Sequence, residues 1–249
     1  MSPTAAEKNL GFYETIQDGD LGYWKHMAAP RVRLARALRA VEDRRPKSLC
    51  DFGCGNAAVL AAVRQLFPGM RLAGVDLSPN LVAANAARHP DMHFEAADLA
   101  RESPGLPFAP EMGLSCEVIE HVDDPAAFLA HVRASLAEGG SLFLSTQSGK
   151  IRPTEVSVGH MCHFTAPELA GLLEEAGFSE VRVWNEGFPF HDLSKALANV
   201  NPQATMARFS GSDYGPAERV TSLALRLLFL FNSRTRGAQL YGTARKGPE

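Results

Sequence analysis

A short strand that runs into a glycine loop constrains the fold of this chain more than any other feature. The segment reads Ser48-Leu49-Cys50-Asp51-Phe52-Gly53-Cys54-Gly55-Asn56-Ala57, and a helical pattern follows it up to Leu66. Glycine allows the backbone to turn sharply and to approach a ligand closely. At such a junction the backbone N–H groups and the positive end of the helix face a ligand. We therefore expect a ligand-binding loop here, the alternative being an ordinary turn that contains two glycines.

Strand and helix patterns alternate along most of the chain. Ser78 before Pro79, and Thr165 before Pro167, mark helix starts, because these hydroxyls cap helices and proline is tolerated in the first turn. This alternation predicts an α/β, Rossmann-like, doubly wound sheet. The expected strands are 47–52, 71–76, 92–96, 112–116, 141–145, 178–184 and 239–245, and the expected helices include 57–67, 125–137 and 165–176.

Breaks in the alternation divide the chain into four segments. Residues 1–45 form a leader with a helix near 34–41, and its aromatic residues either fold over a ligand or pin the leader to the core. Residues 46–185 form the core, and residues 237–249 supply its last strand and a tail. Residues 186–236 carry several prolines and glycines and the apolar helix 219–231, so they predict an inserted helical lid. The apolar faces of that helix fit a lid core, a homodimer surface or a membrane-surface contact.

Composition excludes several classes of protein. The chain has 249 residues, 45% of them hydrophobic, which is enough for a full core. Its net charge of −3 gives no basic footprint for nucleic acid. The four cysteines are scattered without a CxxC pair, which is typical of reduced thiols rather than disulfides. The N-terminus has no apolar signal segment, and no apolar run is long enough to span a bilayer. We expect a soluble cytoplasmic protein without stable membrane insertion.

Three successive strands end in an aspartate, at Asp51, Asp76 and Asp98. Ligands of such sheets bind at the carboxyl ends of the strands. There Asp51 can hold an amino group, Asp76 two ribose hydroxyls and Asp98 the amine of an adenine, which together describe S-adenosylmethionine. The pattern Gly53-x-Gly55-x-x-Ala58 with Asp76 also fits a dinucleotide fingerprint. The other two acids argue against an NAD enzyme, and a third alternative is that all three only cap helices.

Five motifs lie at the ends of the predicted strands and in the turns beside them. They are Asp51-Phe52-Gly53-Cys54-Gly55, Val75-Asp76-Leu77-Ser78, Ala97-Asp98-Leu99, Glu117-Val118-Ile119-Glu120-His121-Val122 and Glu138-Gly139-Gly140-Ser141-Leu142. Together they resemble the class I S-adenosylmethionine-dependent methyltransferases over residues 45–185 and the last strand. The resemblance implies a seven-stranded sheet whose last strand is antiparallel and inserted beside the sixth. It also implies that Leu77 and Leu99 flank the adenine, that Cys116 and Glu117 line the methionine end, and that S-adenosyl-L-methionine is the cofactor.

The histidines that follow strands four and five, His121, His160 and His163, are candidates for a catalytic base, because neutral imidazole suits proton removal near pH 7. The spacing Glu-x-x-Glu-His resembles the metal-binding motif of ubiquinone-biosynthesis O-methyltransferases and of small-RNA 2′-O-methyltransferases, which add a later histidine. If the segment winds helically, its three side chains share a face. The alternative metal ligands are then Glu117, Glu120, His121 and His160. In metal-free relatives the same pair caps a helix, and we expect no metal.

The expected function is methyl transfer to an oxygen or nitrogen of a small metabolite, such as a natural-product or sugar-bearing precursor. Aromatic and histidine side chains outside the core are the candidate acceptor contacts, namely Tyr13, Trp24 and His191. An RNA or protein methyltransferase and a non-catalytic cofactor-binding scaffold are the alternatives. The low basic charge argues against an RNA substrate, and a homodimer stays open.

Overall fold

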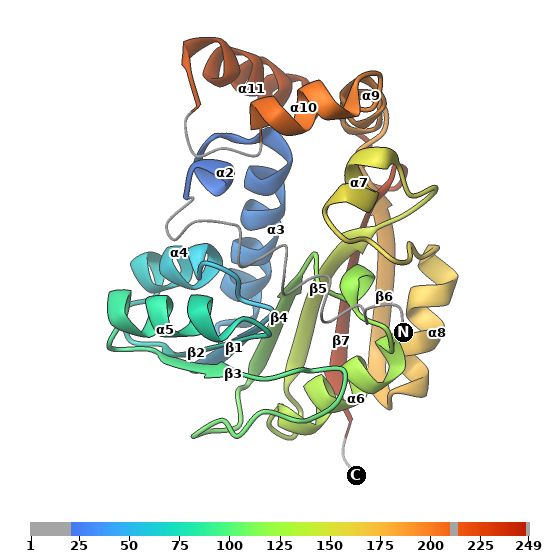
Figure 1. Ribbon diagram of the computed structural model, residues 1–249. Coiled ribbons are helices and arrows are strands. Elements are labelled where there is room, and N and C mark those ends of the chain that lie inside the picture. The colour runs from blue at the N-terminus through green and yellow to red at the C-terminus, as the bar shows by residue number, and fades with distance from the viewer. Residues whose placement is uncertain (1–20, 210–213, 248–249) are drawn as a thin grey trace, which may run out of the picture.

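The computed structural model describes residues 21–209 and 214–247, and a seven-stranded sheet lies at its centre (Figure 1). The strand order is β3-β2-β1-β4-β5-β7-β6, and β7 runs antiparallel to both of its neighbours. This confirms the predicted Rossmann-like sheet and the insertion of the last strand beside the sixth. The strands are β1 Ser48–Phe52, β2 Arg71–Asp76, β3 His93–Ala96, β4 Met112–Cys116, β5 Ser141–Gln147, β6 Phe178–Glu186 and β7 Gln239–Lys246.

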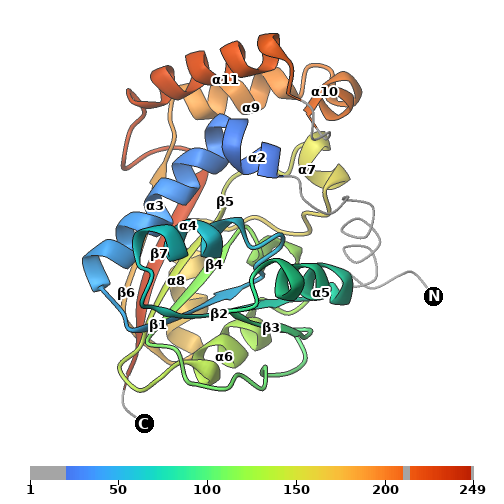
Figure 2. The ribbon, with the colours of Figure 1, turned by 90° about the vertical axis from the view of Figure 1, so that its left-hand side faces the viewer.

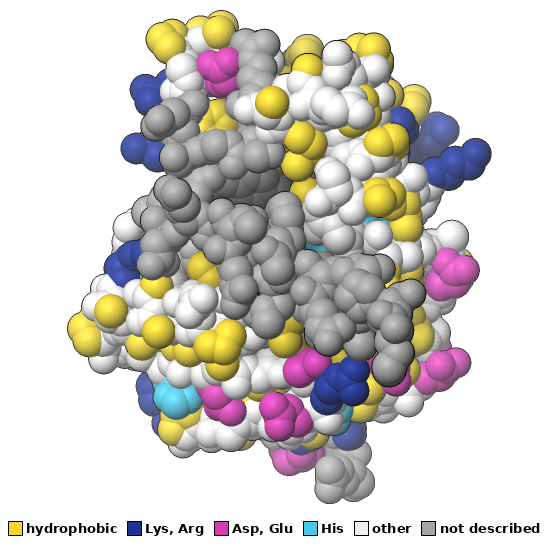
Figure 3. Space-filling view, viewed as in Figure 1, with side chains coloured by type: hydrophobic (Ala, Val, Ile, Leu, Met, Phe, Trp, Pro, Cys, Tyr) yellow, Lys and Arg dark blue, Asp and Glu magenta, His cyan; other side chains and the backbone are white. Residues whose placement is uncertain are grey.

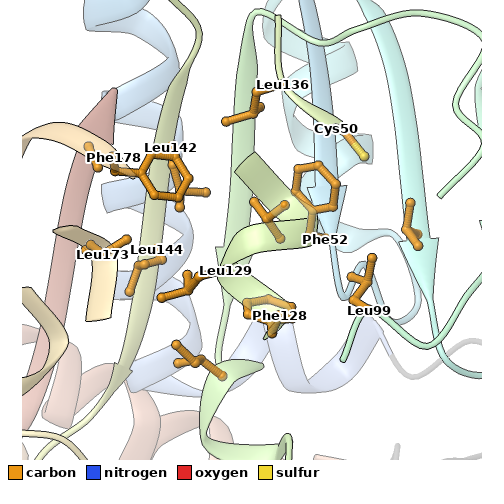
Figure 4. Close-up of a cluster of buried hydrophobic side chains, with 14 of the residues drawn as sticks. Cys50, Phe52, Leu99, Phe128, Leu129, Leu136, Leu142, Leu144, Leu173 and Phe178 are labelled. Carbon is orange, nitrogen blue, oxygen red and sulfur yellow. The ribbon is translucent and has the colours of Figure 1, made fainter. Parts of the chain in front are cut away.

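Helices cover both faces of the sheet, which explains why β1 and β5 are buried along their whole length. One hydrophobic cluster joins the sheet to α3 (Ala28–Arg44) and α4 (Ala58–Leu66). A second cluster joins the other face to α6 (Pro125–Ser135) and α8 (Ala166–Glu175), and Figure 4 shows Phe128, Leu129 and Leu173 from these helices facing the strands. The remaining core helix, α5 (Pro79–Arg88), packs along β2 and β3.

The predicted helix caps are present. Ser78 Oγ accepts a hydrogen bond from the Leu81 amide at 3.3 Å, and Thr165 Oγ1 accepts one from the Glu168 amide at 3.4 Å. The helix before β1 is longer than the predicted 34–41, because Pro30 lies in its first turn, where a missing N–H costs nothing. The strands β5 and β6 run two residues further than predicted, since β7 pairs with both of them as far as Gln239.

The segment after β6 folds into three helices that form a cap (Figure 2). They are α9 Phe190–Ala198, α10 Pro202–Phe209 and α11 Pro216–Phe229. The cap packs on α2 (Leu21–His26), α3 and α7 (Pro153–Ser157), and it bonds to the carboxyl end of β5 through Lys195 and Gln147. The inserted segment is thus helical as expected, and its role as a lid stays a prediction. Within the described ranges, every helix is too short or too polar to cross a bilayer.

Candidate active site

The glycine loop after β1 has the backbone that its sequence predicts. Gly53 has φ +88° and Gly55 has φ +50°, a region that other residues rarely adopt. A Cβ at Gly53 would collide with the Val118 side chain, so the loop packs tightly against the segment after β4. A Cβ at Gly55 would have no heavy atom within 4 Å. The loop is therefore fixed at its first glycine and leaves space beside its second.

Asp76, at the end of β2, holds the loop in place. Its Oδ2 accepts a hydrogen bond from the Gly55 amide at 2.8 Å, and its Oδ1 accepts one from the Ser78 amide at 3.0 Å. Burial raises the pKa of this carboxyl, and these amide donors oppose the rise. A lone pair that these amides leave unused can accept a hydrogen bond from a ligand hydroxyl.

Asp51, at the carboxyl end of β1, carries an unsatisfied buried oxygen. The residue is 2% exposed, and its Oδ1 has no hydrogen-bond partner in the described part of the chain. Burial, and then the nearby Asp76, raise the pKa of this carboxyl well above its usual range. Since buried polar groups are nearly always paired, an orphan oxygen here needs a partner. A cationic group of a ligand beside the glycine loop would supply one.

The other predicted cofactor contacts lie around the same edge of the sheet. Asp98 follows β3, where its Oδ2 accepts a hydrogen bond from Arg101 Nε at 3.1 Å. Leu99 is buried in the hydrophobic cluster beneath the site, and Leu77 is half-buried between β2 and α5. Cys116 ends β4, and burial raises the pKa of its thiol, which keeps it protonated. Their contacts with a cofactor stay predictions.

Glu117 is locked by a network that the sequence did not indicate. Its carboxylate accepts hydrogen bonds from Ser145 Oγ at 3.0 Å, from Gln239 Nε2 at 2.9 Å and from Gln147 Nε2. Arg33, from α3, lies 3.7 Å from the carboxylate. Burial by itself would raise the pKa of Glu117, but Arg33 and the amide donors outweigh it and lower the pKa to about 2. Glu117 is thus a permanently charged group beside the ends of β4 and β5.

The condition for a shared Glu-x-x-Glu-His face is not met. Glu117 has φ +61°, and a short 3₁₀ helix, η1 (Ile119–His121), begins only two residues later. The Glu117 carboxylate is hydrogen-bonded to Gln239, whereas Glu120 Oε2 accepts a hydrogen bond from Thr146 Oγ1 at 2.7 Å.

A second cluster forms from Glu120, His121 and His160. These side chains offer one ligand atom each, and the three atoms lie within 4.8 Å of one another. Glu120 Oε1 is buried without a hydrogen-bond partner among the described residues, and burial with nearby Glu117 raises the pKa of this carboxyl. The rings of His121 and His160 meet edge to face at 4.7 Å. One carboxylate and two imidazoles are a donor set that suits Zn²⁺ or Mn²⁺, so the residues fit a metal without Glu117.

His163 extends this cluster into a row of imidazoles. Its Nδ1 lies 3.1 Å from the Gly149 carbonyl oxygen, and its Nε2 lies 2.9 Å from His160 Nδ1. Burial lowers the pKa of all three histidines, so they are neutral at pH 7. A carbonyl only accepts, so His163 Nδ1 donates to it, His163 Nε2 accepts, and His160 Nδ1 donates in turn. This tautomer leaves the lone pair of His160 Nε2 available to take a proton or a metal ion.

A lysine of the cap also reaches the site, and the sequence analysis missed it. Lys195 Nζ lies 2.5 Å from Glu155 Oε1 and donates to Gln147 Oε1 at 2.7 Å. Its spacing of four from His191 places both on the inner face of α9, which is the only signal that the sequence offered.

Two of the three predicted acceptor contacts, Trp24 and His191, lie in the described part of the chain. His191 is 6% exposed and packs edge to face on Phe229 at 5.7 Å, so it joins α9 to α11. Trp24 packs against the hydrophobic cluster that includes α3 and α4, as expected if the aromatic residues pin the leader to the core. Tyr13 lies outside the described residues. An acceptor role for all three stays a prediction.

Comparison with known proteins shows the family of this chain. A family model described as a methyltransferase domain matches residues 23–183, from α2 to β6. The chain belongs to this methyltransferase family. The match and the sheet topology confirm the resemblance to class I S-adenosylmethionine-dependent methyltransferases. The Glu-x-x-Glu-His resemblance lies outside what these matches address, and its metal-binding role stays a prediction.

Proteins with different names resemble this chain in sequence or in fold. The chain is 27% identical over 188 residues to a trans-aconitate 2-methyltransferase of Rhizobium meliloti, and the match covers 68% of this chain and 72% of that protein. The fold is similar to phosphoethanolamine N-methyltransferase 2 of Haemonchus contortus, with a TM-score of 0.66 and 15% identity. That match covers 99% of this chain but only 61% of the other. It is also similar to the [4+2]-cyclase SpnF, with a TM-score of 0.62, 17% identity and almost complete coverage of both chains.

Proposed function

We propose that this methyltransferase transfers the methyl group of S-adenosylmethionine to an oxygen of a small acceptor. The sulfonium already activates the methyl group, so the protein has to hold the cofactor, align the acceptor oxygen and exclude water. The glycine loop with Asp51 and Asp76 is the proposed cofactor site. Glu117 and the imidazole row are the side chains proposed to contact the acceptor.

The observation that carries this proposal is the orphan oxygen of Asp51 beside the glycine loop. It suits the α-amino group of the methionine part, whereas a dinucleotide would bring an anionic pyrophosphate to the same loop. The structure of the Haemonchus enzyme holds S-adenosylhomocysteine, which supports a cofactor of this kind at the same edge of the sheet. SpnF has the same fold and is named for a cyclisation, so the family match, rather than the fold, supports methyl transfer.

An oxygen acceptor is supported by the state of the histidines. Burial and then His121 lower the pKa of His160 to about 3, so it is a neutral, weak base whose Nε2 lone pair can accept the proton of a hydroxyl as the oxygen attacks the methyl carbon. A carboxylate acceptor needs no base, because its oxygen is already charged at pH 7. The relatives named trans-aconitate 2-methyltransferases support this second kind of acceptor. Lys195, from the cap, is a cation that could pair with such an acid.

The test is a methyl-transfer assay with labelled S-adenosylmethionine and three acceptor sets: tricarboxylic acids, phenols or sugars, and amines. With a hydroxyl acceptor, His160→Gln is expected to lower turnover by about 10²–10⁴-fold and to leave cofactor binding unchanged. With a carboxylate acceptor the same variant is expected to stay within a few-fold of wild type. His89→Gln, at the end of α5, is the control. Labelled product from amines alone would contradict the oxygen acceptor.

A further inference from the structure

The exposed large hydrophobic side chains gather on one part of the molecule. Ten of the thirteen that the described residues contain lie between residues 188 and 231, in the cap and its flanks. Figure 3 shows hydrophobic side chains along the upper rim, over the helices that Figure 1 labels α9 to α11. The ten are Phe188, Leu193, Leu197, Val200, Val220, Leu223, Leu227, Leu228, Leu230 and Phe231.

These side chains form a row on the outer face of α11. Val220, Leu223 and Leu227 are 68%, 54% and 56% exposed, and their spacing of three and four residues keeps them on one side of a helix. The opposite side of α11 faces the protein, since Ser222 and Phe229 are buried. The outer row continues past the end of the helix into Phe231, which is 75% exposed.

A second row lies on the outer face of α9, which packs beside α11. Leu193 and Leu197 are 53% and 62% exposed at a spacing of four residues, and Val200, just after the end of the helix, is 79% exposed. His191 and Lys195 occupy the inner face of the same helix. Two neighbouring helices of the cap thus turn their apolar rows away from the sheet, a feature that marks an interaction surface.

The charge around these rows is basic. Between residues 214 and 238 the described chain holds four arginines, Arg219, Arg226, Arg234 and Arg236, and a single acid, Glu218. The whole chain has a net charge of −3, so the segment that contains α11 is positive on a negative molecule. A contact between two copies through α11 would bring two positively charged segments together, which opposes it. A partner with an apolar interior and anionic groups at its surface fits both the leucines and the arginines.

We propose that α9 and α11 lie on the surface of an anionic lipid bilayer. The apolar rows insert among the acyl chains, and the arginines contact the phosphate groups, as in amphipathic helices that lie in the plane of a membrane. α11 has only 14 residues, so it rests on the bilayer without crossing it. The proposal depends on the cap alone and holds whatever acceptor the enzyme uses.

The test is flotation of the full chain with vesicles of phosphatidylcholine alone or with added phosphatidylglycerol. Wild type is expected to float with the anionic vesicles and to be released at high salt, because screening weakens attraction to the phosphates. Leu227→Glu is expected to weaken this binding about tenfold, since it places a charge where an apolar side chain would insert into the bilayer. Leu66→Glu is the matched control, because Leu66 is a helical leucine with 59% exposure on α4. Melting temperature and cofactor binding verify that each variant is folded.

Several results would overturn the proposal. One is wild-type protein that stays in the vesicle-free fraction. Another is Leu227→Glu that floats as well as Leu66→Glu. A third is a wild-type dimer in sedimentation velocity that is lost in Leu227→Glu, because a second copy would then cover the apolar rows. Equal binding of wild type to both kinds of vesicle would contradict the role of the arginines.

Discussion

At the scale of single residues, Asp51 links cofactor binding to pH. Its raised pKa keeps part of the carboxyl neutral in the absence of ligand, whereas an ammonium group nearby favours the ionised form. Binding therefore releases a proton from Asp51, and affinity for S-adenosylhomocysteine is expected to rise with pH between 5 and 7, by at most about tenfold per pH unit. Titration calorimetry across this range measures the slope.

Asp51→Asn is expected to bind more weakly at pH 7 and to lose this slope. Asp91→Asn is the surface control, since the Asp91 carboxylate pairs with Arg64 at 2.9 Å. This variant is expected to keep the pH dependence of binding. A wild-type dissociation constant that is the same at pH 5 and pH 7 would show that Asp51 does not face the amine.

The histidine row can act as a base or as a metal site, and both roles use the lone pair of His160 Nε2. Our account assigns that lone pair to proton removal, so turnover is expected to be unchanged in EDTA. The measurement is the methyl-transfer rate with EDTA, followed by addition of Mg²⁺, Mn²⁺ or Zn²⁺. Calorimetry of Zn²⁺ and Mn²⁺ on wild type and on Glu120→Gln gives a second readout that does not depend on activity. Loss of turnover in EDTA, restored by one ion and accompanied by binding that Glu120→Gln removes, would assign the cluster to a metal.

At the scale of elements, a buried ion pair between Lys195 and Glu155 is one of the contacts that attach the cap beside the site. Lys195 is 15% exposed and Glu155 10% exposed in their side chains, so removal of the lysine leaves a buried carboxylate without its cation. Lys195→Met is expected to destabilise the protein by about 3–5 kcal/mol and to speed proteolytic cleavage between residues 186 and 236. Thermal unfolding and limited proteolysis measure the two effects.

Arg39→Met is the control, because it removes exposed pairs with Glu42 and Asp43 that are each worth at most about 1 kcal/mol. In wild type, cofactor and acceptor together are expected to slow cleavage of the cap if it acts as a lid. Cleavage of Lys195→Met at the wild-type rate would mean that other contacts hold α9.

The elements that sequence patterns located well are those with strong local signals. The apolar run before Asp76 marks β2 exactly where the structure has it, and Ser78 with Pro79 marks the start of α5. The end of β6 was predicted at 184 and lies at Glu186, because its last residues pair with β7 from far along the chain. Glu117 shows the same limit, since Arg33 and Gln239 reach it from distant segments. Such partners leave no mark in the local pattern.

At the scale of the whole molecule, the sheet assembles groups that lie far apart in sequence. Parallel strands bring Asp51 and Asp76 to one edge, and the chain after β5 brings His160 and His163 over the same edge. The antiparallel β7 closes the sheet and carries Gln239 to Glu117. The family's sheet topology thus accounts for why charged and imidazole groups meet beside a glycine loop.

The central claim is that this edge binds S-adenosylmethionine rather than a dinucleotide. The most direct measurement is titration calorimetry of the protein with S-adenosylhomocysteine and, separately, with NADH. Our account predicts saturable binding of S-adenosylhomocysteine at one site per chain, no heat with NADH, and loss of most of the affinity in Asp76→Ala. Saturable binding of NADH with none of S-adenosylhomocysteine would contradict it.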